Sequence, residues 1–181
     1  MTHPNAGHWQ GQHPYRSTAN GRSDIGDLVE WCEGTGFELS GKVLDIGCGS
    51  GRMAAACDDY TGVDITPSYV EYCQANGLNV SLIEGSHDLP AGPFDRIIMS
   101  SVMTHMHHAD RVAYLHAIRP ILDGEALLDI LPGHHDEGSL RAWYCDPAVF
   151  AADLKLAGFT IVSTLEWQAP DLFTHLYFRV R

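Results

Sequence analysis

The stretch "VLDIGCGSGR", residues 43–52, places three glycines at every second position between a hydrophobic run and a segment of small residues. The glycines are Gly47, Gly49 and Gly51, and Asp45 stands two residues before the first of them. Because glycine has no Cβ, it adopts positive φ angles readily and lets a ligand approach the backbone. When such a turn joins a strand to a helix, it predicts a ligand site at the carboxyl end of the strand.

Hydrophobic runs alternate with helical segments along the rest of the chain. The expected strands are "KVLDIG" (42–47), "YTGVDI" (60–65), "NVSLIEG" (79–85), "FDRIIMSS" (94–101), "EALLDIL" (125–131), "TIVSTLEW" (160–167) and "HLYFRVR" (175–181). Strands separated by helices predict parallel βαβ units, with right-handed crossovers that put helices on both faces of the sheet. The last two strands lack a helix between them and should pair antiparallel. The expected fold is therefore α/β: one doubly wound, mostly parallel seven-stranded sheet with a C-terminal antiparallel strand pair.

Helix boundaries are marked by capping residues. Ser23 is expected to cap a helix that contains Cys32, and "SGRMAAAC" (50–57) is expected to form a short helix. Thr66 with Pro67, and Asp146 with Pro147, predict two more N-termini, which Gly77 and Gly158 follow at the C-terminal ends. A further helix from about Asp110 should bury an apolar stripe, which consists of Val112, Leu115, Ile118 and Leu122.

The domain organisation is expected to be simple. Residues 1–22 are polar and predict a loose arm that could close over an active site, whereas residues 23–181 form one domain. The arm has no apolar segment typical of a signal peptide, and no run reaches the roughly 18 apolar residues of a membrane span. A cytoplasmic protein is therefore expected, and a homodimer is left open.

Asp64, at the end of the second expected strand, indicates which nucleoside the turn accommodates. A carboxylate there can accept hydrogen bonds from both hydroxyls of a ribose. The glycine spacing is G-x-G-x-G, unlike the G-x-G-x-x-G of dinucleotide sites. Asp45 would repel a pyrophosphate beside the turn but suits a ligand that carries a positive group.

Four motifs in order, "VLDIGCGSGR", "GVDI", "GSHDLP" and "FDRIIMSSVMTHM", resemble those of the class I S-adenosylmethionine-dependent methyltransferases. The resemblance runs from about Ser23 to Arg181 and implies S-adenosyl-L-methionine as the cofactor. Many relatives carry an acid where this chain has Ser86, so the contact with the adenine amino group could fall to Asp88.

The resemblance also implies roles for individual residues. The turn would approach the methionine part of the cofactor, and Asp45 would orient the turn. Asp64 would hold the ribose, and Ile65 would pack on the adenine. The cofactor-binding set that follows is Asp45, Gly47, Cys48, Gly49, Gly51, Arg52, Asp64, Ile65, Ser86, His87, Asp88 and Ser100.

Histidines supply the candidate catalytic groups, because imidazole titrates near neutral pH and can take a proton from a hydroxyl. His105, in the loop after the fourth strand, is the first candidate, and His134, in the loop after the fifth, is the second. Most histidines in such loops face solvent. His105, His107, His108 and Asp110 could also hold a divalent metal, but their spacing is tight for one ion, and no metal site is predicted.

Composition limits the partners. The chain has 11 Lys and Arg against 23 Asp and Glu, with a formal net charge of −12. So acidic a chain is not expected to bind nucleic acid or an anionic membrane. The five cysteines contain no C-x-x-C pair and are expected to be reduced packing residues.

These observations predict a methyltransferase that acts on O or N of a small-molecule acceptor by in-line methyl transfer. The alternatives are a non-catalytic S-adenosylmethionine-binding regulatory module and a protein methyltransferase. A nicotinamide oxidoreductase is disfavoured by the glycine spacing.

Overall fold

The computed structural model describes residue 32 and residues 36–133, 138–139, 142–168 and 174–181. The predicted arm and most of the first expected helix lie outside these residues. Cys32 is described, and it is helical and fully buried.

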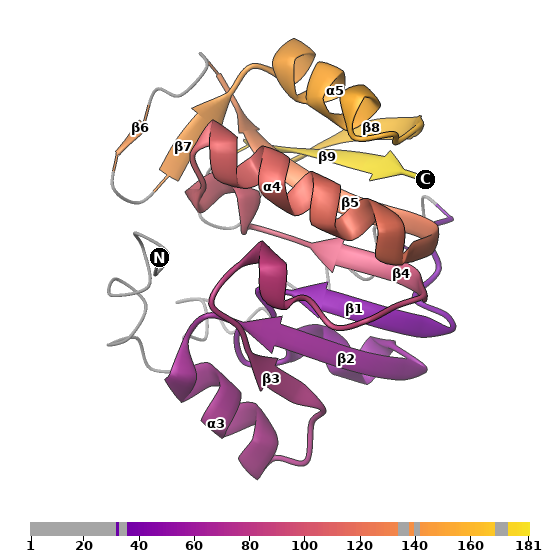
Figure 1. The fold of residues 1–181 in the computed structure, drawn as a ribbon, viewed down its shortest axis with the longest axis vertical. Helices are drawn as coiled ribbons and strands as arrows, with labels where there is room; N and C mark the ends of the chain where they lie inside the picture. The colour runs from indigo at the N-terminus through magenta and orange to yellow at the C-terminus, as the bar shows by residue number, and fades with distance from the viewer. Residues whose placement is uncertain (1–31, 33–35, 134–137, 140–141, 169–173) are drawn as a thin grey trace.

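One sheet organises the described residues (Figure 1). Its strands are β1 (Lys42–Ile46), β2 (Asp59–Asp64), β3 (Val80–Leu82), β4 (Phe94–Met99), β5 (Leu122–Pro132), β6 (Gly138–Ser139), β7 (Ala142–Cys145), β8 (Ile161–Gln168) and β9 (Thr174–Val180). β3, β2, β1, β4 and β5 are parallel neighbours in that order. β9 then pairs antiparallel with both β5 and β8. These seven strands are the seven expected from the sequence, so the predicted fold class is confirmed.

Two short strands were not expected. β7 pairs in parallel with the end of β5 at Leu131 and Pro132, and β6 pairs antiparallel with β7. Both lie in the segment after the fifth strand that the sequence predicts as a loop. With them, the part of the chain that the structure describes contains nine strands.

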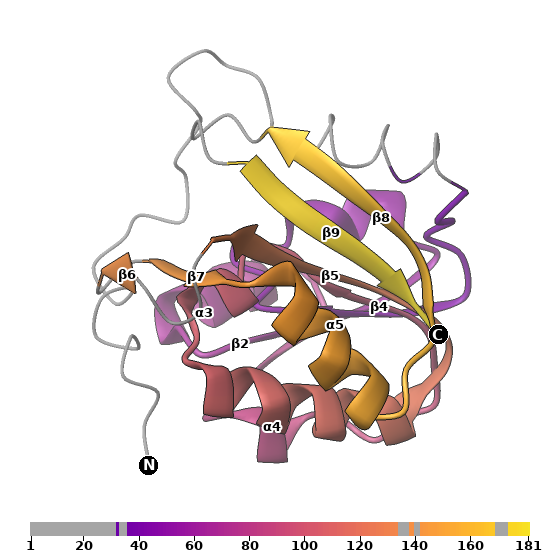
Figure 2. The same ribbon diagram turned by 90° about the horizontal axis from the view of Figure 1, so that it is seen from above.

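Helices connect the strands. From residue 36 onward, the described α-helices are α3 (Pro67–Ala75), α4 (His108–Ile118) and α5 (Pro147–Leu156), and the 3₁₀ turns are η1 (Arg52–Ala56), η2 (Ser86–Asp88), η3 (Met103–His105) and η4 (Arg119–Ile121). Figure 2 shows α4 and α5 together on one face of the sheet. The largest buried cluster includes Leu115 and Ile118 of α4 and Phe150 and Leu154 of α5. A second contains Cys32, Phe37, Val43, Met53, Ile98, Leu127 and Tyr177, and a third contains Cys48, Val70, Cys73 and Val80. The described residues therefore bury apolar side chains in three clusters.

Most expected helix ends are confirmed. Thr66 and Asp146 are N-caps of α3 and α5, and the Asp146 Oδ1 atom accepts a hydrogen bond from the Ala148 N–H at 2.7 Å. The segment expected to form a helix after the glycine turn is instead the five-residue 3₁₀ turn η1.

The predicted stripe of α4 was partly wrong. Leu115 and Ile118 are buried as expected, but Val112 is only half-buried and Leu122 begins β5. The other buried positions are Arg111 and Tyr114. A charged residue thus occupies a place on the inner face that apolar periodicity cannot reveal.

Candidate cofactor site

The glycine turn leaves β1 in a conformation that glycine favours. Gly47, Gly49 and Gly51 have φ angles of 73°, 54° and 73°. A Cβ on Gly47 would overlap a methyl group of Val102, and one on Gly51 would overlap Leu78, whereas a Cβ on Gly49 would meet open space. Packing therefore requires glycine at the first and third positions, and the second leaves the backbone accessible.

Asp64 connects the end of β2 to this turn. Its Oδ2 atom accepts a hydrogen bond from the Gly49 N–H, and its Oδ1 atom accepts one from the Thr66 N–H, both at 2.8 Å. Burial raises the pKa of Asp64, while these hydrogen bonds act to lower it. Each carboxylate oxygen has a second lone pair, so the group can still accept from a ligand.

A cavity of about 420 Å³ opens beside the turn and Asp64. The residues that line it are Ile46, Gly47, Gly49, Arg52, Asp64, Ile65, Thr66, Tyr69, Ile83, Ser100, Ser101, Val102, His105, Met106 and Tyr114. They come from the carboxyl ends of β1, β2, β3 and β4 and from η1, α3, η3 and α4. Ligand sites in open α/β sheets lie at this edge, where the strand order reverses between β1 and β4.

Seven of the residues predicted from the sequence lie together on this cavity: Gly47, Gly49, Arg52, Asp64, Ile65, Ser100 and His105. Cys48 and Gly51 belong to the turn but do not line the cavity. His134 lies outside the described residues. The roles of all these residues in binding and catalysis stay predictions.

Asp45 lies beneath the turn. It is 5% exposed, it is not part of the cavity lining, and its Oδ2 atom accepts a hydrogen bond from the Tyr60 hydroxyl at 3.0 Å. The pKa of Asp45 is raised to about 7, chiefly by burial; the hydrogen bond from Tyr60 acts to lower it, and the nearby Asp64 carboxylate acts to raise it. The geometry suits support of the loop better than direct contact with a ligand.

Three residues of the predicted cofactor-binding set, Ser86, His87 and Asp88, form η2, and none of them lines the cavity. The Asp88 Oδ2 atom accepts a hydrogen bond from the Glu84 N–H at 2.8 Å, and His87 Nε2 lies 3.6 Å from the same oxygen. Asp88 therefore stabilises the turn to which it belongs.

Several cavity residues were missed by the sequence analysis: Ile46, Thr66, Tyr69, Ile83, Ser101, Val102, Met106 and Tyr114. Val102 and Met106 belong to the quoted fourth motif, so their positions after β4 were a usable signal. No such sequence signal marked Tyr114, because it lies on α4, beyond the end of that motif. Burial raises the pKa of Tyr114 to about 12, so its hydroxyl keeps its proton at neutral pH.

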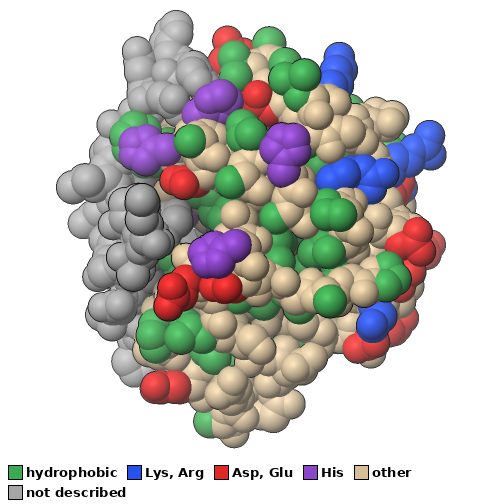
Figure 3. Space-filling model, in the orientation of Figure 1, with side chains coloured by type: hydrophobic (Ala, Val, Ile, Leu, Met, Phe, Trp, Pro, Cys, Tyr) green, Lys and Arg blue, Asp and Glu red, His purple; other side chains and the backbone are tan. Residues whose placement is uncertain are grey.

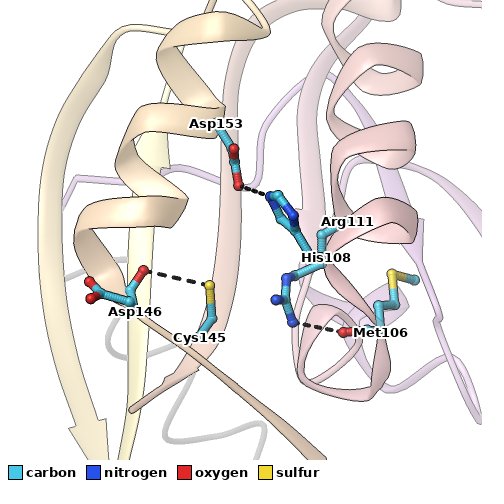
Figure 4. Close-up of polar contacts among 6 residues, drawn as sticks. All are labelled: Met106, His108, Arg111, Cys145, Asp146 and Asp153. Carbon is cyan, nitrogen blue, oxygen red and sulfur yellow. Dashed lines mark hydrogen bonds and ion pairs between the residues drawn. The ribbon is translucent and has the colours of Figure 1, made fainter. Parts of the chain in front are cut away.

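The loops after β4 and β5 meet near the cavity. The ring centroids of His107 and Trp143 lie 3.8 Å apart. His108 Nε2 lies 2.9 Å from Asp153 Oδ2 on α5, and the buried Arg111 donates a hydrogen bond to the Met106 carbonyl at 2.7 Å (Figure 4). The segments that follow β4 and β5 are therefore neighbours.

Charge is unevenly distributed over the face seen in Figure 3. His side chains lie on the left and in the centre of the view, whereas Lys and Arg side chains lie towards the right. Within the described part of the chain, no group of three or more His, Cys, Asp or Glu side chains is arranged to hold a metal ion. No helix among the same residues has both the length and the apolar character to cross a bilayer.

The strand order, the glycine turn after β1 and the acid at the end of β2 are features of the class I methyltransferase fold. Residues 43–124 match a protein family described as a methyltransferase domain, so the resemblance predicted from the sequence is confirmed.

Known proteins agree with this assignment. The chain is 37% identical over 97 residues to the ribosomal protein L11 methyltransferase of Thermus thermophilus, a match that covers 48% of this chain and 37% of that protein. The chain thus spans little more than a third of that relative.

Solved structures share the fold at low sequence identity. Magnesium protoporphyrin IX methyltransferase from Synechocystis, solved with bound S-adenosylmethionine, superposes with a TM-score of 0.70 at 22% identity, over 87% of this chain and 77% of that one. An S-adenosylmethionine-dependent methyltransferase from Leishmania major gives a TM-score of 0.78 at 15% identity, over 97% and 81%.

Proposed function

We propose that this chain is a methyltransferase that uses S-adenosyl-L-methionine to methylate O or N of a compact acceptor. The observation that carries the proposal is the cavity at the carboxyl ends of β1, β2 and β4, where exposed turn backbone faces a buried carboxylate. Its volume of about 420 Å³ falls in the range of roughly 300–1,000 Å³ typical of small-molecule sites.

The residues present suit the cofactor. Gly49 offers backbone with no side chain between it and the cavity, which fits the methionine part. Asp64 has lone pairs left for the ribose hydroxyls, and Ile65 supplies an apolar surface for the adenine. Arg52 is a cation on the same wall that can pair with a carboxylate. When bound, the cofactor supplies a methyl group already activated by its sulfonium charge.

His105 is the proposed general base. It is half-buried and lies on the cavity wall beside Val102 and Met106. If the acceptor is a hydroxyl, the imidazole would take its proton as the oxygen attacks the methyl carbon, and such help is typically worth about 10²–10⁴-fold in rate. Positioning the acceptor in line with the methyl group can itself lower the activation free energy by roughly 7–11 kcal/mol. His134 remains the second candidate.

A small-molecule acceptor fits the size and charge of the site. The wall is largely apolar: Ile46, Ile83 and Val102 line it together with Tyr69 and Tyr114. The net charge of −12 disfavours nucleic acid. The cytoplasmic location and the homodimer stay predictions.

A protein acceptor is the second candidate. It is favoured by the 37% identity to an enzyme whose name gives a ribosomal protein as its substrate. The matched segment is less than half of either chain, so the part that chooses the acceptor need not be shared. A regulatory module that binds the cofactor without turnover is the third candidate.

Two measurements test the proposal. Calorimetry should detect binding of S-adenosylhomocysteine and none of NAD, and the reverse preference would overturn the cofactor assignment. Incubation with methyl-labelled cofactor and fractionated metabolites, with ribosomal proteins in parallel, should label a small molecule. Label in protein alone would establish the second candidate, and cofactor binding without label in either pool would favour the third.

A further inference from the structure

We propose that Asp129 and His175 are positioning residues for the cavity wall after β4, because they hold Ser101 in an unfavourable backbone conformation. The inference concerns the shape of the wall and rests on contacts alone. Its consequence for methyl transfer rests on the proposed function.

Ser101 is the residue under constraint. Its φ angle is 58°, and it is the only non-glycine residue with a positive φ among those the structure describes. An L-residue adopts this conformation at a cost in free energy, so surrounding contacts must stabilise it. Its backbone N–H donates a hydrogen bond to the Asp129 Oδ1 atom at 2.7 Å.

Asp129 reaches Ser101 because of the strand register. Met99 of β4 lies beside Leu128 of β5, so the residues that follow them, Ser100 and Asp129, lie side by side. Asp129 is fully buried, and its second oxygen, Oδ2, lies 2.5 Å from the Nδ1 atom of His175, which is 2% exposed. One carboxylate thus accepts from a loop backbone and from a ring on β9.

A second link runs parallel to the first. Antiparallel pairing places Tyr177 of β9 opposite Asp129. The Tyr177 hydroxyl lies 2.8 Å from the Ser100 Oγ atom, with a hydrogen bond between them. Both serines after β4 are therefore held by hydrogen bonds to side chains of β5 and β9.

The attached segment forms one wall of the cavity. Ser100, Ser101, Val102 and His105 all line it. Val102 packs so closely on Gly47 that a Cβ on that glycine would overlap it. The conformation of Ser101 therefore sets the contact between the loop after β4 and the glycine turn, and it sets where η3 with His105 begins.

The test replaces Asp129 by asparagine and asks whether a glycine at residue 101 corrects the defect. An amide has one acceptor oxygen, so it cannot accept from both the Ser101 N–H and the His175 ring; the ring must change tautomer to accept from the NH₂ group, and the charge of the carboxylate is lost from both hydrogen bonds. Hydrogen–deuterium exchange of the 100–105 segment should rise about tenfold or more in Asp129→Asn, with exchange in β1 and β4 unchanged.

The second substitution separates positioning from a general loss of stability. Glycine adopts φ near 58° without strain, so Asp129→Asn combined with Ser101→Gly should return exchange to within about twofold of the wild type. Ser101→Ala is the matched control, because it removes the same hydroxyl and keeps the strain, and it should not restore protection. Equal rescue by both, or no rise in Asp129→Asn, would overturn the inference.

A milder variant covers the case in which Asp129→Asn does not fold. His175→Phe keeps a ring and removes the hydrogen bond to the Asp129 Oδ2 atom, so it should raise exchange of the same segment by a smaller factor, and no rise would overturn the inference. Affinity for S-adenosylhomocysteine, measured in the same proteins, should follow the exchange data. If the wild type does not bind that ligand, the proposed function fails, while the exchange result still decides the role of Asp129.

Discussion

The Asp64 carboxylate and the Gly49 amide form a hydrogen bond of 2.8 Å that joins the end of β2 to the turn after β1. The acid predicted to hold a ribose is therefore also part of the scaffold that shapes the turn. Its replacement should affect folding and binding together, and the two effects can be measured separately.

Asp64→Asn leaves one acceptor oxygen for the two N–H groups of Gly49 and Thr66. The free energy of unfolding should fall by about 1–3 kcal/mol, the cost of one unsatisfied buried group. Affinity for S-adenosylhomocysteine should fall at least about tenfold, since hydrogen bonds to a charged group contribute roughly 1.5–3 kcal/mol. Denaturant titration would measure the free energy of unfolding, and calorimetry would measure the affinity. Asp58→Asn, at an exposed position, is the control, and unchanged affinity in Asp64→Asn would contradict the ribose role.

Alanine at the first and second glycines of the turn should have different effects. Both positions have positive φ, so each substitution should cost roughly 1–2 kcal/mol of stability. Gly47→Ala adds an overlap with Val102, which should cost about 1–3 kcal/mol more. Gly49→Ala puts its methyl group in open space on the cavity, so its larger effect should be on ligand affinity.

A double variant tests this explanation of the turn. Val102→Ala removes the methyl groups that a Cβ on Gly47 would meet, so it should recover part of the stability lost in Gly47→Ala. The same change added to Gly49→Ala should recover nothing. Equal recovery in both would show that the overlap is not the cause.

Asp45 should make folding stability depend on pH. Its pKa is raised from 3.8 to about 7, chiefly by burial, so between about pH 4 and pH 7 the folded chain holds a proton that the unfolded chain has lost. The free energy of unfolding should therefore fall as pH rises through this window and level off above it.

Asp45→Asn removes this titration and keeps an acceptor oxygen for the Tyr60 hydroxyl. Its stability relative to wild type should grow from pH 4 to pH 7 and reach on the order of 2–4 kcal/mol, given about 1.4 kcal/mol for each pKa unit. Denaturant titrations at pH 5, 6, 7 and 8 would measure it, with the exposed Asp123→Asn as the control. Parallel curves for Asp45→Asn and wild type would refute the assignment.

His105→Gln tests the general base. Turnover on an acceptor that must lose a proton should fall about 10²–10⁴-fold, because glutamine cannot take the proton. Affinity for S-adenosylhomocysteine should stay within about twofold. His116→Gln is the matched control, since His116 is exposed on α4 and does not line the cavity. A full rate in His105→Gln would remove His105 from the reaction.

Much of the fold could be predicted because its signals are local. Each strand is a short apolar run, and Pro67, Asp146 and the glycines mark where helices begin and end. The topology then brings Gly47, Asp64 and Ser100 to one edge, because parallel strands end at the same side of a sheet. The position of the cavity therefore follows from the order of strands and helices, without any knowledge of side-chain contacts.

The remaining features depend on contacts between distant residues. Asp129 lies within a run that reads as a buried strand, and its partner His175 is 46 residues further along the chain. Arg111 occupies the inner face of α4 because its guanidinium bonds to the Met106 carbonyl. Asp45 lies beneath the turn because the Tyr60 hydroxyl meets it there. No periodicity or motif spacing reports such pairs.

The position of β9 between β5 and β8 has a consequence during synthesis on the ribosome. β5 leaves the ribosome well before β9, and the 46 residues from Asp129 to His175 take roughly 2–9 s to translate at about 5–20 residues per second. During that interval β5 exposes a hydrophobic edge that a nascent neighbour could join. A ribosome that stalls between these two strands would thus release a product prone to aggregate.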